Sequence, residues 1–178
     1  MEIMYLGQAS FQLRGERVVD VNPIQKPARG NIALYSTRQS TRQLVVDGPG
    51  EYEIGGVLIA TAQAGSKDSG VLVHSVTMGN LNLVHLTVGG DDLSERALED
   101  LGKVDILLVQ ADEVAEAQAA IQKLEPRVVI PFGSRAMELC IALGVPQPRT
   151  ETRFSWNGTT NAPKAVLLKP SGAKRRAA

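Results

Sequence analysis

The strongest constraint on the fold is a change of pattern near residue 90. Before it, short runs rich in Val, Ile and Leu are separated by Gly, Pro, Asn or Asp, and no helical period appears. After it, apolar runs alternate with segments of helical period. Strands followed by strand–helix alternation predict an α+β or layered α/β fold with a β-rich N-terminal half.

The same pattern predicts individual elements. Strands are expected at residues 2–6, 10–14, 17–20, 31–36, 44–47, 57–62, 71–77, 82–86, 104–110, 127–131, 150–156 and 164–169. Helices are expected from a cap at Asp91, Asp92 or Ser94 to Gly102, from Asp112 to before Pro126, and from Ser134 through Leu143. We expect one domain over residues 1–169 and a disordered basic tail at 170–178, which contains Lys174, Arg175 and Arg176.

Composition excludes several classes of protein. The 178 residues include 19 Lys plus Arg and 19 Asp plus Glu, so the excess of positive charge that a nucleic-acid binder needs is absent. No apolar run approaches the roughly 20 residues of a membrane helix, and the N-terminus lacks the pattern of a signal peptide. We therefore expect a soluble, cytoplasmic protein without a membrane or nucleic-acid partner.

The chain contains only two histidines, His74 and His85, and a single cysteine, Cys140. A histidine-rich or cysteine-based metal site is therefore impossible, and any metal would rest mostly on carboxylates. We expect His85 to be half-buried with its polar atoms satisfied. His74 is expected to face outward or to pair across a sheet, and Cys140 to be buried.

Several segments resemble the metallo-β-lactamase superfamily. The most specific is residues 47–57, DGPGEYEIGGV, and residues 4–11, MYLGQASF, resemble a first-strand signature of leucine, glycine, histidine and alanine or serine. Residues 18–23, 84–89, 101–109 and 124–131 keep the register. The nearest branch is that of small bacterial metal-dependent hydrolases related to ascorbate-6-phosphate lactonase. The resemblance covers residues 1–169 and implies a four-layer αββα sandwich with a site at the strand ends.

The resemblance breaks at the positions that would supply metal ligands in the family. Those positions hold Gln8, Thr37, Gln39, Thr41, Arg42, Val88 and Gly133, and Asp20 is the acid expected to remain near the site in a supporting role. Zinc and similar ions need imidazole, thiolate or carboxylate donors, whereas valine and glycine offer no side-chain donor. Without a metal the family's hydrolysis loses its activated water. We therefore expect no metal and no other cofactor.

The leading hypothesis is a pseudoenzyme, a non-catalytic binding or interaction module for a protein partner or a small anion. Arg38, Arg42, Thr37 and Thr41 are the candidate anion-binding residues, because guanidinium and hydroxyl donors suit phosphate or carboxylate. Arg42 carries the sign of the missing cation, so it is expected to point into the old site and pair with Asp20 or another acid there.

Two alternatives stay open. The first is an active hydrolase of altered chemistry on an ester, lactone or phosphate substrate, which needs acids such as Asp20, Glu51 or Asp91 to converge, or Arg42 as an electrophile. The second is a structural subunit of a homo-oligomer, with Phe154 and Trp156 as aromatic anchors of its interface.

Overall fold

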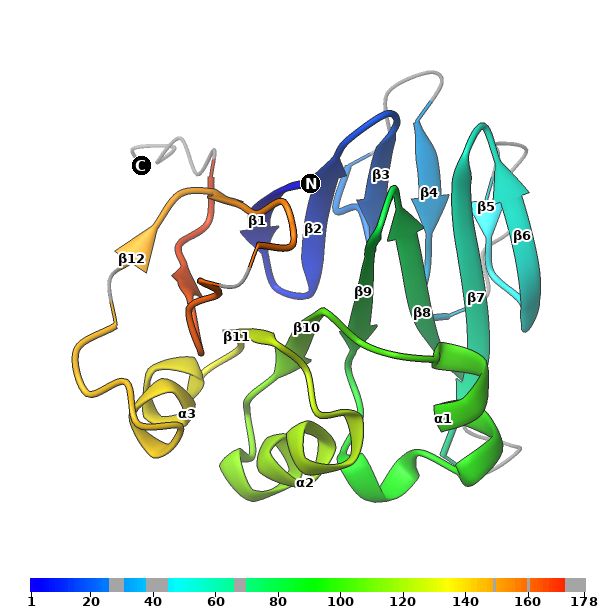
Figure 1. Cartoon of the computed structure of the whole chain (residues 1–178). Coiled ribbons are helices and arrows are strands. Elements are labelled where there is room, and N and C mark those ends of the chain that lie inside the picture. Colours follow the sequence, from blue (N-terminus) through cyan, green and yellow to red (C-terminus); the bar gives the residue numbers. More distant parts are fainter. Residues whose placement is uncertain (26–30, 38–44, 66–69, 149, 160, 172–178) are drawn as a thin grey trace, which may run out of the picture.

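Two six-stranded sheets face each other, and helices cover the outer face of one of them (Figure 1). The computed structural model describes residues 1–25, 31–37, 45–65, 70–148, 150–159 and 161–171. Within these residues, the second half of the chain supplies all three α-helices, and most of the strands come from the first half. The predicted layered α/β architecture with a β-rich N-terminal half is confirmed.

The first sheet is built mainly from the N-terminal strands. Its order is β13 (Phe154–Ser155), β1 (Glu2–Gly7), β2 (Ser10–Arg14), β3 (Val18–Val21), β4 (Ile32–Leu34) and β5 (Val45–Val46). Neighbouring strands from β13 to β3 run antiparallel, whereas β3, β4 and β5 are parallel. Alternate residues such as Phe11 and Leu13 are fully buried, as expected for strands with one face on a core.

The second sheet combines antiparallel and parallel pairing. Its order is β11 (Val128–Phe132), β10 (Ile106–Gln110), β9 (Leu81–Leu86), β8 (Val71–Met78), β7 (Val57–Ala64) and β6 (Gly50–Ile54). The strands from β6 to β9 are antiparallel, and β9, β10 and β11 are parallel. β10 and β11 are buried on both faces, which explains their nearly continuous apolar sequences.

Three short helices pack on the second sheet. They are α1 (Glu95–Leu101), α2 (Val114–Leu124) and α3 (Ala136–Ala142), with a 3-10 turn, η1 (Gly90–Asp92), before α1. As predicted, Ser94 caps α1 by accepting a hydrogen bond from the Ala97 amide at 3.1 Å, and Gly102 ends it with φ 65°. None of the helices in the described ranges is long and apolar enough to cross a bilayer.

Three sequence-based assignments need correction. No strand was expected between residues 47 and 57, yet β6 pairs with β7 there as an edge strand. The strands expected at 150–156 and 164–169 are much shorter, namely β12 (Thr150–Glu151), β13 and β14 (Leu167–Leu168). Helices α2 and α3 also begin later than expected, at Val114 and Ala136, and Ser134 does not cap α3.

Two apolar clusters hold the layers together. One lies between the two sheets, and the other lies between the second sheet and the helices and includes fully buried Cys140, as predicted. Phe154 and Trp156 belong to the first cluster with 7% and 8% exposure, and the Arg127 guanidinium lies 4.6 Å from the centre of the Trp156 ring. Both aromatic residues are therefore core residues, and the hypothesis that they anchor an oligomer interface is wrong.

The close contact between η1 and α2 predicts that Gly90→Ala destabilises the fold. A methyl group at Gly90 would lie 2.6 Å from the Ala119 carbonyl carbon, so α2 must shift. We expect a loss of about 1–3 kcal/mol in the free energy of unfolding, measured by urea titration. Gly48→Ala is the control, because its methyl group would meet only the Tyr52 hydroxyl, at 3.7 Å. Equal midpoints for the two variants would contradict this packing.

Candidate functional site

Among the described residues, those at the positions that the resemblance assigns to metal ligands follow the ends of strands. Gln8 follows β1, Val88 follows β9 and Gly133 follows β11. Thr37 is exposed and is the third residue after β4. Arg38, Gln39, Thr41 and Arg42 lie outside the described residues, so the proposed anion-binding loop and the pairing of Arg42 with an acid stay predictions.

Gln8 forms part of a tight turn between β1 and β2. Its backbone adopts a left-handed conformation with φ 55°, and its residue is exposed. The Tyr5 hydroxyl donates a hydrogen bond to the Gln8 carbonyl oxygen at 2.8 Å. Protein contacts therefore set the shape of this turn.

At the end of β11, a carboxylate occupies the space beside Gly133. Asp112 accepts hydrogen bonds from the Ser134 amide at 2.7 Å and from the Ser134 hydroxyl at 2.8 Å. A Cβ atom at Gly133 would lie 2.7 Å from the same Asp112 oxygen, and φ there is 102°. These hydrogen bonds and one from Gln110 lower the pKa of Asp112, so it stays ionised.

Asp20 is buried with its hydrogen-bonding capacity directed to neutral amides. Its two carboxylate oxygens accept hydrogen bonds from Gln12 Nε2 at 2.8 Å and from Asn31 Nδ2 at 2.7 Å. These contacts link β2, β3 and the residue before β4. They give Asp20 a structural role within the first sheet.

The described residues at the old ligand positions do not fit a metal. Val88 packs against the cluster between the second sheet and the helices, and Gly133 has no side chain. The acids named for an altered hydrolase do not converge either, since Asp20 lies on β3, Glu51 on β6 and Asp91 on η1 beside Lys123. Across the ranges that the structure describes, no group of three or more His, Cys, Asp or Glu side chains is arranged to hold a metal ion.

Both histidines lie opposite each other between the two sheets. His74 on β8 pairs in register with His85 on β9, and both are fully buried. The His85 ring stacks on Phe132 with 5.5 Å between ring centres and meets Phe11 edge-on at 5.8 Å. The predicted pairing of His74 across the sheet is confirmed. The alternative that His74 faces outward and the expected half-burial of His85 are wrong, because β8 and β9, which carry the two histidines, are buried on both faces.

Burial keeps the two rings neutral. The Thr61 hydroxyl lies 3.0 Å from His74 Nδ1, whereas His74 Nε2 and both nitrogens of His85 have no hydrogen-bond partner among the described residues. Burial lowers the pKa of His74 to about 4. Burial and the neighbouring His74 lower the pKa of His85 to about 3. The backbone carbonyls of Tyr35 and Ala9 act in the opposite direction on the two pKa values, but burial outweighs them.

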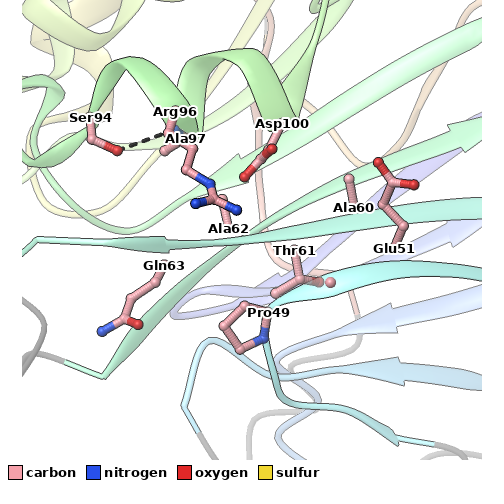
Figure 2. Close-up of a pocket in the computed structure, with 11 residues that line it drawn as sticks. Pro49, Glu51, Ala60, Thr61, Ala62, Gln63, Ser94, Arg96, Ala97 and Asp100 are labelled. Carbon is pink, nitrogen blue, oxygen red and sulfur yellow. Dashed lines mark hydrogen bonds between the residues drawn. The ribbon is translucent and has the colours of Figure 1, made fainter.

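A separate cavity of about 470 Å³ lies on the outer face of the second sheet, between β6, β7 and α1 (Figure 2). Ala60 and Ala62 on β7 and Ala97 on α1 give it small apolar walls. Charged side chains of both signs line it, namely Glu51, Arg96 and Asp100. Of these three, only Glu51 was singled out from the sequence. Arg96 and Asp100 were missed because only tertiary packing brings α1 close to β6.

Comparisons with known proteins support the fold. A β-lactamase superfamily domain matches residues 34–133, more than half of the chain. A proposed Zn-dependent hydrolase of the metallo-β-lactamase superfamily from Thermotoga maritima superposes with a TM-score of 0.76 at 18% identity, covering 94% of this chain and 97% of that one. The metallo-β-lactamase fold protein YhfI from Bacillus subtilis gives 0.56 at 10% identity, covering 96% and 97%.

A more distant structural match is CmlA, a diiron β-hydroxylase from Streptomyces venezuelae. Its TM-score is 0.54 at 12% identity, with 74% of this chain and 44% of that chain covered. No match was found among curated protein sequences. Identities this low establish the fold alone. The predicted metallo-β-lactamase-like sandwich is confirmed, although the described helices cover one sheet only, so the fourth layer of the αββα order is not seen in the described residues.

The buried histidine pair predicts a loss of stability in mild acid. The unfolded rings take up protons near pH 6.5, whereas the folded rings stay neutral down to about 4 and about 3. Stability is therefore complete above pH 6.5 and falls as the pH drops below it. At pH 5 we expect each histidine to cost about 2 kcal/mol, measured by urea unfolding.

The variant His74→Gln tests the origin of this effect. It removes one of the only two histidines in the chain, so about half of the stability change between pH 7 and pH 5 should disappear. Replacing an exposed acid, as in Glu99→Gln, serves as the control and should leave the slope unchanged. A flat stability profile for the native chain over this range would show that the rings are not held neutral.

Proposed function

This chain belongs to the β-lactamase superfamily, and we propose that it is a metal-free member whose role is to bind a charged ligand or a protein partner. We place it beside the small bacterial hydrolases related to ascorbate-6-phosphate lactonase, on the motif at residues 47–57. The proposal rests on which side chains occupy the strand ends. At the described positions where the family would hold a metal, Val88 and Gly133 have no side-chain ligand atom, and local hydrogen bonds join Tyr5 to Gln8 and Ser134 to Asp112.

The donor chemistry argues against hydrolysis by the family's route. A catalytic metal centre needs about three protein ligands of the imidazole, carboxylate or thiolate type, and its ion supplies an activated water at neutral pH. Val88 and Gly133 offer no donor, and Gln8 offers only a weak neutral one. Asp112, the ionised acid beside Gly133, already accepts hydrogen bonds from Ser134 and Gln110.

Hydrogen bonds between protein groups stabilise the strand ends. The Asn22 side chain, just after β3, donates to the Ser36 hydroxyl at 2.9 Å and accepts from the Ser36 amide at 2.8 Å. Ser36 directly precedes Thr37, so this pair anchors the start of the segment that would carry the family's main ligand motif. The bond from Tyr5 to Gln8 and the bonds from Ser134 to Asp112 act in the same way at two other strand ends.

Metal analysis tests the proposal directly. Protein purified without chelator and freed of any affinity tag should contain far less than one equivalent of zinc, iron or manganese by mass spectrometry. EDTA should leave its unfolding midpoint unchanged, because no metal stabilises the native state. A zinc hydrolase treated in parallel serves as the control and should lose stability. Stoichiometric metal that EDTA removes, with a drop in the midpoint, would refute the proposal.

Restoring a ligand should not restore a site. In Gly133→His, the new side chain must adopt a strained backbone with φ 102° and displace Asp112, so we expect a loss of about 1–3 kcal/mol and no gain in zinc affinity. The variant Gly133→Ala should lose a similar amount, because the backbone and Cβ cause the strain. Unchanged stability together with zinc binding in the histidine variant would contradict this account.

A further inference from the structure

The cavity on the outer face of the second sheet contains charges that have no partner. Arg96 and Asp100 project from successive turns of α1, and Glu51 projects from β6 on the opposite wall (Figure 2). None of these three side chains takes part in an ion pair or side-chain hydrogen bond within the described residues. By contrast, Arg135 and Arg153 are both paired with carboxylates.

From this arrangement, we propose that the cavity binds a small zwitterion with the chemistry of a free α-amino acid. The planar guanidinium of Arg96 suits the ligand's carboxylate, which it can bind through two parallel hydrogen bonds. Asp100 and Glu51 suit the ammonium group, which has three donors to share between two carboxylates. One ligand would therefore contact both walls of the cavity, α1 and β6.

A ligand of a single charge fits less well. A simple anion at Arg96 would face the two carboxylates, and a simple cation between the carboxylates would lie near the guanidinium. Only a molecule with both charges a few ångströms apart satisfies all three side chains. Because two acids and one base line the cavity, a neutral or singly cationic amino acid is preferred over an acidic one.

The size and surroundings of the cavity agree with such a ligand. Its volume of about 470 Å³ lies within the usual range for small-molecule sites. A second cavity of about 560 Å³ shares Glu51, Ala60 and Asp100 with it and extends toward Tyr52 and Leu58. Leu58 is 52% exposed and offers an apolar surface for the ligand's side chain.

This proposal rests on the binding function proposed above and names the class of ligand. The binding itself does not depend on the strand ends, because the cavity is lined by residues of β6, β7 and α1, and Gln8, Val88 and Gly133 do not line it. A metal at the strand ends would leave the cavity unchanged. The two proposals can therefore fail separately.

Calorimetric titration with L-leucine and L-lysine tests the proposal. Both should bind in a saturable way, and L-glutamate should bind at least about tenfold more weakly. N-acetyl-L-leucine lacks the ammonium group and L-leucinamide lacks the carboxylate, so each should also bind at least about tenfold more weakly. Comparable binding by either derivative, or no saturable binding of L-leucine and L-lysine, would overturn the proposal.

Variants locate the site. Arg96→Gln and Asp100→Asn should each weaken L-leucine binding by about tenfold or more, whereas Glu99→Gln, an exposed acid on the same helix that does not line the cavity, should change it by less than about twofold. All three positions are exposed, so unfolding midpoints should match the native chain. Equal effects of Asp100→Asn and Glu99→Gln would overturn the assignment. Metal content measured on the same samples separates this result from a failure of the metal-free proposal.

Discussion

The contact of Phe11, His85 and Phe132 between the sheets fixes the end of the sandwich on which the rest depends. Phe11 comes from β2, His85 from β9 and Phe132 from β11, so one group of stacked and edge-on rings joins strands of both sheets. These rings lie within three residues of Gln8, Val88 and Gly133 in the sequence. Core packing therefore positions these strand ends without help from a loop or a ligand.

Such packing explains how the fold can persist with an altered site. A metal ion joins several strand ends through strong bonds, and its loss would leave those ends without a common partner. Here local hydrogen bonds from Tyr5, Asn22 and Ser134 close three of the strand ends separately. Each is worth about 1 kcal/mol, which suffices because the apolar core already holds the strands.

The sequence predicted the elements whose signals are local. Ser94 and Gly102 bound α1, and the apolar run of β10 marks a strand with two buried faces. The unsuitable ligand positions were also readable, since they follow from motif register. The contact of Asp112 with Ser134 was not, because it depends on the parallel pairing of β10 and β11. Likewise, the direction of His74 was ambiguous because β8 is buried on both faces.

Strand alternation gives the two faces of β7 different surroundings, which is what the two proposals together require. On β7, Thr61 faces the interior and contacts His74, while Ala60 and Ala62 face outward and line the cavity beneath α1. Small side chains at these two outward positions leave space that leucine or isoleucine would fill. The inner face of β7 carries the packing that stability requires, and the charged residues around the cavity come from α1 and β6. A ligand there would complete an electrostatic arrangement that the chain leaves open, without disturbing the core.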